Sequence, residues 1–266
     1  MRSLFSALTI IAIVVIMFAV GYRLAPNPAQ QVAENLPAAK QAKQHSPEHS
    51  GHHVHAEIQA GLALARSEKF DFDPPAPGTY QLPVIRTAAD GEVLDVSGNE
   101  RLLHDVYDGK VILLSFIYTR CTDANGCPLA TAVLYKIFGA SKVDETLASN
   151  LRMISLSFDP ANDTPEVMAG YRGSDAAHWQ GGAEWVDLTT ASDEQLAPIL
   201  SEYDQVVRRR ADEQGNPTDQ FGHQLRAYLI DRNKRIRNIY GLGFLDPRLL
   251  IADVKTLLAE EHVASH

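Results

Sequence analysis

Apolar runs alternate with amphipathic stretches through residues 71–266, and their order predicts an α/β fold. Residues 111–118, VILLSFIY, form a continuous apolar run typical of a strand buried on both faces of a sheet. Residues 151–158 and 185–188 predict two more core strands, and a helical pattern follows each of the three. In the first helix, which begins at Pro128, apolar residues recur at three- and four-residue spacing. Alternating strands and helices of this kind predict parallel crossovers.

The remaining segments add antiparallel strands at both ends of this pattern. Residues 80–85 predict a short edge strand, and a second short strand is expected near Val93. Residues 225–230 and 236–240 flank a turn and predict a hairpin, after which Asp246 and Pro247 begin a last helix. The prediction is a mixed sheet covered by helices on both faces.

The segment after the second core strand carries helix-start signals. Residues 163–166 supply a capping oxygen from Asp163, a proline in the first turn, and an acid where the helix dipole favours one. Asp159 fits a turn residue. Neither aspartate needs a further role on this interpretation.

An uncharged apolar run occupies residues 3–22. At about 1.5 Å per residue it nearly spans a hydrocarbon core of roughly 30 Å. It is longer than the apolar region of about 7–15 residues in a cleaved signal peptide. We therefore expect residues 1–23 to be a transmembrane anchor, with a signal peptide as the alternative. Arg2 favours a cytoplasmic N-terminus, which predicts a single-pass protein of the cell inner membrane with its domain in the periplasm.

The composition of residues 24–70 predicts a flexible, proline-interrupted linker ahead of the domain at 71–266. Half of the ten histidines of the chain lie between positions 45 and 55. Neutral imidazoles bind copper, zinc and nickel, so this tract is either an auxiliary metal-binding segment or a solvated linker. The five candidate ligands are His45, His49, His52, His53 and His55.

Composition narrows the classes of function. A hydrophobic content of 45% and a charged content of 21% are those of a globular protein. The formal charge of -9 argues against a nucleic-acid partner, whose phosphates favour a basic surface. Two cysteines are too few for a disulfide scaffold, so the core must be stabilised by its own burial.

Both cysteines lie in one strand–loop–helix segment: Cys121 follows the first core strand, and Cys127 directly precedes Pro128. The helix start and Arg120 favour a thiolate there, whereas Asp123 opposes it. Three uses are open on these residues alone. They are a structural disulfide worth about 2 kcal/mol, a redox dithiol, and a site for a soft ion such as Cu(I), completed by a histidine.

Over roughly residues 80–260 the chain resembles the SCO/SenC family of membrane-anchored, thioredoxin-like proteins that help to load copper into cytochrome c oxidase. The matching segments are residues 109–121 (GKVILLSFIYTRC), Cys127 with Pro128, residues 155–160 (SLSFDP), residues 163–166 (DTPE), and His223 ahead of residues 227–231 (AYLID). Their order and spacing are specific as a set.

The resemblance implies a thioredoxin-like fold and a copper site formed by Cys121, Cys127 and His223. It further implies a metallochaperone for Cu(I) or Cu(II), whose partner is a respiratory oxidase subunit or another copper-receiving protein. The alternative is a membrane-anchored thiol-disulfide oxidoreductase that uses Cys121 and Cys127, with His223 a bystander. A third option is a protein-binding domain with a structural disulfide.

The chain departs from the family pattern at two positions. Five residues separate the cysteines, where the family has three, and Gly222 stands before the histidine, where an aspartate is common. The longer loop is expected to move one sulfur, and the missing acid removes a partner that would orient the imidazole. Both changes favour the redox alternative.

Overall fold

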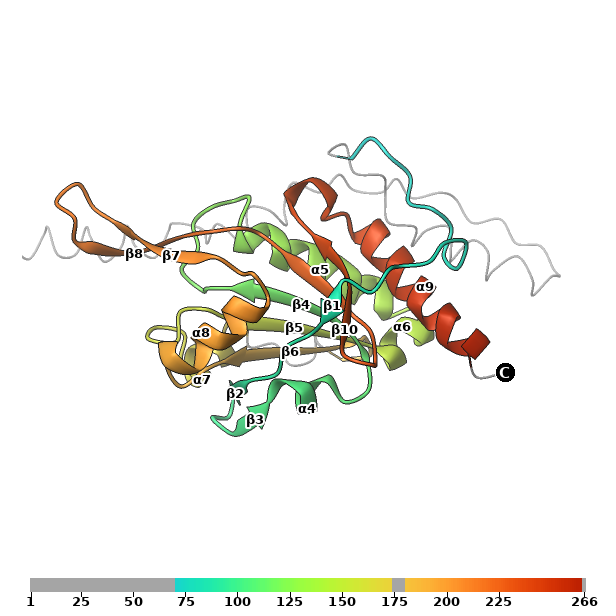
Figure 1. Cartoon of the computed structure of the whole chain (residues 1–266), viewed down its shortest axis with the longest axis horizontal. Helices are drawn as coiled ribbons and strands as arrows, with labels where there is room; N and C mark the ends of the chain where they lie inside the picture. The colour runs from blue at the N-terminus through green and yellow to red at the C-terminus, as the bar shows by residue number, and fades with distance from the viewer. Residues whose placement is uncertain (1–69, 174–179, 265–266) are drawn as a thin grey trace, which may run out of the picture. The chain divides into compact units, whose positions relative to one another are not determined.

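An eight-stranded mixed sheet forms the centre of the domain in this computed structural model, which describes residues 70–173 and 180–264 (Figure 1). The strand order is β1-β10-β9-β4-β5-β6-β2-β3. The strands of the sheet are β1 (Arg86–Thr87), β2 (Glu92–Asp95), β3 (Glu100–Leu102), β4 (Val111–Ile117), β5 (Leu151–Ser157), β6 (Glu184–Thr189), β9 (Ala227–Ile230) and β10 (Arg235–Tyr240).

Strands β4, β5 and β6 run parallel at the centre, and β9 pairs antiparallel with β4. Every residue of β4 is buried, as its unbroken apolar run predicts. Its side chains alternate between two cores: Ile112 and Leu114 pack in one, and Val111 and Leu113 pack in the other. The predicted α/β class with a mixed sheet is confirmed.

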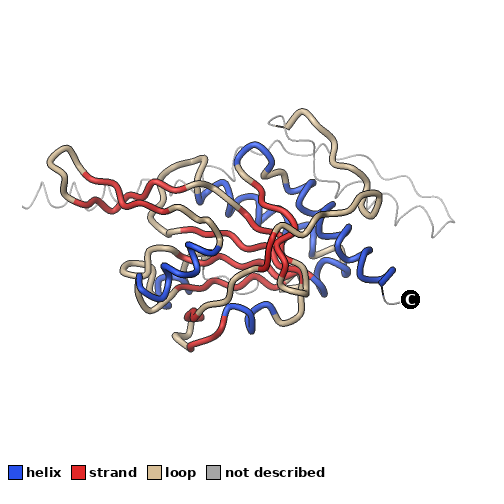
Figure 2. Tube along the Cα trace, in the orientation of Figure 1, coloured by secondary structure: helices blue, strands red, loops and turns tan. Residues whose placement is uncertain are grey.

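Helices cover both faces of the sheet (Figure 2). Residues of α5, α6 and α9 fill one core, and residues of α4, α7 and α8 fill the other. The helices are α4 (Leu103–Tyr107), α5 (Cys127–Ser141), α6 (Glu145–Asn150), α7 (Pro165–Ala169), α8 (Asp193–Glu202), the 3-10 turn η2 (Leu242–Phe244) and α9 (Pro247–Ala264).

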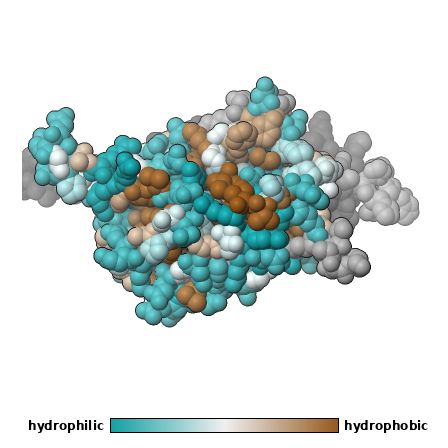
Figure 3. Space-filling view, in the orientation of Figure 1, coloured by the Kyte–Doolittle hydropathy of each residue, from teal (hydrophilic) through white to brown (hydrophobic). Residues whose placement is uncertain are grey.

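A two-stranded ribbon, β7 (Val207–Ala211) and β8 (Pro217–His223), extends away from the sheet (Figure 1). The sequence pattern did not predict it, because its strands are largely exposed and lack an apolar alternation. Its far end is hydrophilic in Figure 3. The base of the ribbon brings His223 back to the domain, so this unpredicted element positions a predicted site residue.

Two local predictions are wrong. The strand expected at residues 80–85 is irregular, and the edge strand begins at Arg86, where pairing with β10 becomes regular. Asp163 does not cap α7: the Thr164 side chain accepts the hydrogen bond from the Val167 N–H instead. Asp163 is turned inward and fully buried.

Several predictions fall on residues that the structure does not describe. The anchor at residues 1–23, the linker up to residue 69 and the five histidines of the 45–55 tract all lie outside the described residues. Within the described part of the chain, no helix has the length and apolar character needed to cross a membrane.

Candidate metal centre

Two sulfurs and one imidazole nitrogen converge at one end of the sheet. The Cys121 Sγ lies 3.9 Å from the Nε2 atom of His223, and the Cys127 Sγ lies 3.7 Å from it. The three potential ligand atoms all lie within 4.8 Å of one another. The structure therefore brings together the three residues that the sequence singled out.

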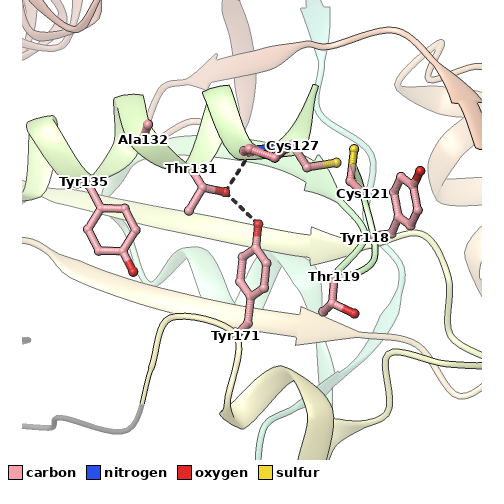
Figure 4. Close-up of a pocket in the computed structure, with 9 residues that line it drawn as sticks. Tyr118, Thr119, Cys121, Cys127, Thr131, Ala132, Tyr135 and Tyr171 are labelled. Atoms are coloured by element: carbon pink, nitrogen blue, oxygen red, sulfur yellow. Dashed lines mark hydrogen bonds between the residues drawn. The ribbon is translucent and has the colours of Figure 1, made fainter. Parts of the chain in front are cut away.

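Each ligand is positioned by a different element. Cys121 follows the end of β4, Cys127 is the first residue of α5, and His223 is the last residue of β8. Both cysteines are free thiols; Cys121 is half-buried and Cys127 is 1% exposed. In Figure 4 the two sulfur atoms point toward one another between the helix and the loop.

The spacing of these atoms fits a small, soft metal ion. Metal–sulfur and metal–imidazole bonds of about 2.3 Å and 2.0 Å, as for zinc, separate a sulfur from a nitrogen by roughly 3.7 Å in a trigonal arrangement. The observed sulfur–nitrogen separations are 3.7 and 3.9 Å. Thiolates suit Cu(I) and zinc, and imidazole suits copper and zinc, so the donor set is compatible with copper. The longer loop between the cysteines has not moved a sulfur out of reach.

Aromatic rings hold the imidazole of His223. Its ring centroid lies 5.1 Å from that of Phe158 and 5.8 Å from that of Tyr118, the latter at an interplanar angle of 89°. Its Nδ1 atom is buried and has no hydrogen-bond partner among the described residues. Packing, rather than a carboxylate, therefore fixes the orientation of this ring.

The geometry also corrects the interpretation of Gly222. Neighbouring residues of a strand point to opposite faces, and a Cβ added at Gly222 would lie 3.9 Å from Nε of Arg210. An acid at position 222 would face Arg210 and not the imidazole of His223. Its absence does not remove a partner of His223.

The five-residue loop folds back through a turn at Asp123. The Gly126 N–H donates to the Asp123 carbonyl at 2.8 Å, and the Asn125 N–H donates to the Asp123 carboxylate at 3.0 Å. A Cβ at Gly126 would lie 3.1 Å from the Cys121 Sγ. The loop thus closes directly against the sulfur, and glycine leaves room for it.

We expect Gly126→Ala to lower copper affinity by about tenfold, the lower end of the loss that follows changes next to metal ligands. The added methyl group must displace the Cys121 sulfur or the loop. Gly139→Ala is the matched control, since a Cβ there meets nothing within 4 Å. Competition titration of both variants checks this; equal affinities would show that the loop does not position Cys121.

The pKa values of the two thiols are shifted in opposite directions. A hydrogen bond from the Cys127 thiol, followed by one from the His223 imidazole, lowers the pKa of Cys121 to about 4. The same pairing with Cys121, together with burial, raises the pKa of Cys127. The helix start, where Cys127 lies, was expected to favour a thiolate. The thiol with the lowered pKa is instead the half-buried Cys121. The predicted contribution of Arg120 is wrong, because its guanidinium turns to Asp159 and Asp219.

This difference predicts how the copper-free, reduced chain reacts with iodoacetamide. A thiol is reactive as the thiolate, which predominates above its pKa. The alkylation rate of Cys121 should therefore stay nearly constant from about pH 5 to 8, whereas an ordinary thiol with a pKa of about 8.5 gains roughly tenfold per pH unit. Cys127 should remain unmodified. Mass spectrometry of quenched samples checks both; a tenfold rise per unit at Cys121 would contradict the lowered pKa.

A buried carboxylate joins the cysteine loop to the β7–β8 ribbon. Asp159, whose side chain is fully buried, accepts from Arg120 at 3.3 Å and from Arg209 at 3.4 Å. Arg120 also pairs with Asp219 at 2.9 Å, and the guanidinium of Arg209 lies 4.4 Å from the Phe221 ring centroid. The loop with Cys121 and strand β7, which pairs with the strand of His223, are thereby bonded to one carboxylate. Sequence reasoning missed this role, since it needs the unpredicted ribbon.

A second buried carboxylate fixes the end of β4. Asp163 accepts from the Thr119 N–H at 2.9 Å, from the Thr119 hydroxyl at 2.5 Å, and from the Ser157 hydroxyl at 2.6 Å. Thr119 lies two residues before Cys121, so these bonds set where the cysteine loop begins. In the sequence, Asp163 follows an apolar strand but also precedes a helix start, so it was interpreted as a helix cap. Its role at the end of β4 was therefore missed.

The remaining candidates lie away from the centre. The His104 ring bonds to the Ala88 carbonyl at 3.0 Å. The Trp185 indole N–H donates to the Ser155 hydroxyl at 2.9 Å and its ring packs on Tyr135. Trp185 therefore packs within one of the two cores.

Comparisons with known proteins identify the fold and the family. The fold is that of the thioredoxin-like Sco proteins. The SCO1/SenC family model matches residues 88–259, well over half of the chain. The chain belongs to the SCO1/SenC family. No significant match to a curated protein sequence is found.

Solved structures share the fold. Arabidopsis thaliana ScoI, determined with copper bound, is 19% identical with a TM-score of 0.53, covering 65% of this chain and 99% of that one. A SCO1/SenC family lipoprotein from Bacillus anthracis is 25% identical with a TM-score of 0.52, covering 65% and 95%. BsSco, described as a member of the Sco family of cytochrome c oxidase assembly proteins with a disulfide switch, is 24% identical with a TM-score of 0.50, covering 66% and 96%.

Proposed function

We propose that this chain is a metallochaperone that binds copper through Cys121, Cys127 and His223 and delivers it to the copper centre of a respiratory oxidase or a related copper enzyme. One observation carries the proposal: side chains from three separate elements place two sulfurs and a nitrogen within 4.8 Å of one another. Membership of the SCO1/SenC family and the copper bound to the Arabidopsis relative support it.

The donor set suits copper in either oxidation state. Two thiolates favour Cu(I), and the imidazole makes Cu(II) tolerable. Because binding displaces protons from the ligands, we expect the affinity to fall at acid pH. The half-buried Cys121 leaves the metal accessible to a receiving protein, whereas Cys127 holds it from inside the core.

We further propose that residues 1–23 anchor the chain in the cell inner membrane, with the domain in the periplasm. The uncharged apolar run of the sequence supports this. On a flexible linker, the histidines of the 45–55 tract would raise the copper concentration near the site. Protease accessibility of the domain in spheroplasts tests the topology; protection from external protease would contradict it.

The function is tested by copper transfer. The full chain, loaded with one equivalent of Cu(I), is mixed with the copper-free copper-binding domain of an oxidase subunit, and the copper content of each protein is measured after separation. We expect transfer from the wild type. His104→Ala should transfer equally, whereas His223→Ala should bind copper more weakly and therefore transfer less. Failure of the loaded wild type to transfer would refute the chaperone role.

A thiol-disulfide oxidoreductase is the second candidate, and the contrasting thiols favour it. The accessible Cys121, with its lowered pKa, suits a nucleophile that attacks a partner disulfide. Cys127 would then displace the partner thiol, so that two electrons pass to the partner and a Cys121–Cys127 disulfide remains. Reduction of a disulfide-containing partner by the copper-free wild type, and by His223→Ala at a rate no more than moderately lower, would favour this function over the chaperone.

A further inference from the structure

A cavity of about 260 Å³ adjoins the two sulfurs (Figure 4). Its walls come from the end of β4, the first turns of α5 and the turn after α7, and include Tyr118, Thr131, Tyr135 and Tyr171. Cys121 and Cys127 also line it, but His223 does not. The cavity therefore meets the metal centre at its sulfurs alone.

The polar groups of these walls are engaged within the protein. The Thr131 hydroxyl donates to the Cys127 carbonyl at 2.9 Å and lies 2.6 Å from the Tyr171 hydroxyl. The Tyr135 hydroxyl donates to the Arg172 carbonyl at 3.1 Å, and that of Tyr118 to Gln220 at 3.2 Å. Apart from the two cysteines, no charged side chain among the described residues lines the cavity. The part of the cavity wall that can contact a ligand is therefore mainly aromatic ring faces and methyl groups. Such a surface suits an uncharged, apolar group.

The net charge of the copper site limits which soft ligand atoms of a partner could bind the copper through this cavity. Two thiolates already outweigh the single charge of Cu(I), so a third thiolate would add a second net negative charge next to apolar walls. A thioether is a neutral soft ligand for Cu(I), and its sulfur packs favourably against aromatic rings. Methionine is the side chain that combines these properties.

We propose that this cavity receives a methionine side chain of the copper-receiving protein, whose thioether sulfur binds the copper beside Cys121 and Cys127. The inference rests on the proposed copper-binding function. The thioether donates a lone pair to Cu(I) to form the new bond; no electron is transferred and no proton is released. The bond to the accessible Cys121 then breaks, and its sulfur leaves with the bonding pair as a thiolate. A methionine in the cavity is thus the first step of ligand exchange.

The test uses the full chain with one equivalent of Cu(I) and two probes, N-acetyl-Gly-Met-Gly-amide and the same peptide with norleucine. Norleucine has nearly the shape of methionine but no sulfur. With a ¹³C-labelled terminal methyl group on each probe, we expect the methionine signal to shift on titration with copper-loaded chain. Its affinity should be at least about tenfold higher for loaded than for copper-free chain, whereas the norleucine probe should not distinguish them.

Two variants locate the binding. Ala132 lines the cavity from an exposed position of α5, so Ala132→Phe should fill its mouth without disturbing the core. It should lower the affinity of the methionine probe by about tenfold or more and leave copper affinity unchanged. Lys136→Phe, one turn further along α5 and outside the lining, should bind the probe as the wild type does.

The outcomes separate this inference from the proposed function. If the chain takes up no Cu(I) against a chelating competitor, the copper function itself fails. If copper binds but both probes behave alike, or Ala132→Phe binds the methionine probe unchanged, the methionine site is wrong while the copper function stands.

Discussion

Cys127→Ser should reduce the Cu(I) affinity of the full chain by more than about 100-fold. The change removes one of the two soft donors, so its cost should exceed the 10–100-fold that follows loss of a group merely supporting a ligand. Serine is close to cysteine in size, and Cys127 is 1% exposed at the start of α5, so the fold should persist. Competition with a chelating Cu(I) ligand measures the affinity, and circular dichroism checks the fold.

Histidine variants give the matched comparison. His223→Ala should also weaken copper binding strongly, whereas His104→Ala, which removes an imidazole bonded to the Ala88 carbonyl, should leave it unchanged. The competitor must be strong enough to keep copper off the tract at residues 45–55, whose imidazoles are poorer ligands for Cu(I) than thiolates. A Cys127→Ser chain that binds copper as tightly as the wild type would remove Cys127 from the ligand set.

Asp163→Ala should destabilise the domain by about 3–5 kcal/mol, the largest loss of stability that we expect from a single change near the site. The substitution leaves the Thr119 N–H and the hydroxyls of Thr119 and Ser157 without their acceptor. An unsatisfied buried polar group costs about 1–3 kcal/mol, and hydroxyl rotation recovers part of the sum. Because Thr119 begins the cysteine loop, copper affinity should fall as well. Urea denaturation of the copper-free chain measures the free energy of unfolding.

Two controls interpret that result. Asp105→Ala removes an exposed carboxylate and should cost less than about 1 kcal/mol. Asp163→Asn keeps the size and one acceptor oxygen, so its loss should lie between those of Asp105→Ala and Asp163→Ala. If Asp163→Ala is no less stable than Asp105→Ala, the buried carboxylate does not fix the end of β4.

The core strands and the site were predictable for different reasons. The apolar run at 111–118 is long and free of charges, and burial of all seven residues of β4 confirms its interpretation. Pro128 placed the start of α5 to within one residue, and the spacing of Val133 and Ile137 indicated its buried face. The ligand set came from the family resemblance, since nothing local links His223 to a cysteine about a hundred residues away. The structure brings these residues together, and their binding of copper remains a prediction.

What the sequence did not predict depends on tertiary contacts. Strands β7 and β8 pair outside the main sheet and bury few side chains, so no hydrophobic period marks them. Because the ribbon was not predicted, the sequence indicated only a turn role for Asp159. In the structure Asp159 binds Arg120 and, from the ribbon, Arg209. The effect of the longer loop likewise depends on Gly126: a Cβ at that position would lie 3.1 Å from the Cys121 sulfur, which only the three-dimensional structure shows.

The central claim is that one copper ion binds to Cys121, Cys127 and His223 together. X-ray absorption at the copper edge, on the full chain with one equivalent of Cu(I), tests it most directly. The account predicts two sulfur neighbours and one imidazole nitrogen in the wild type, one sulfur fewer in Cys127→Ser, and loss of the imidazole signal in His223→Ala. A wild-type spectrum with only nitrogen neighbours would place the copper on histidines elsewhere in the chain and contradict the account.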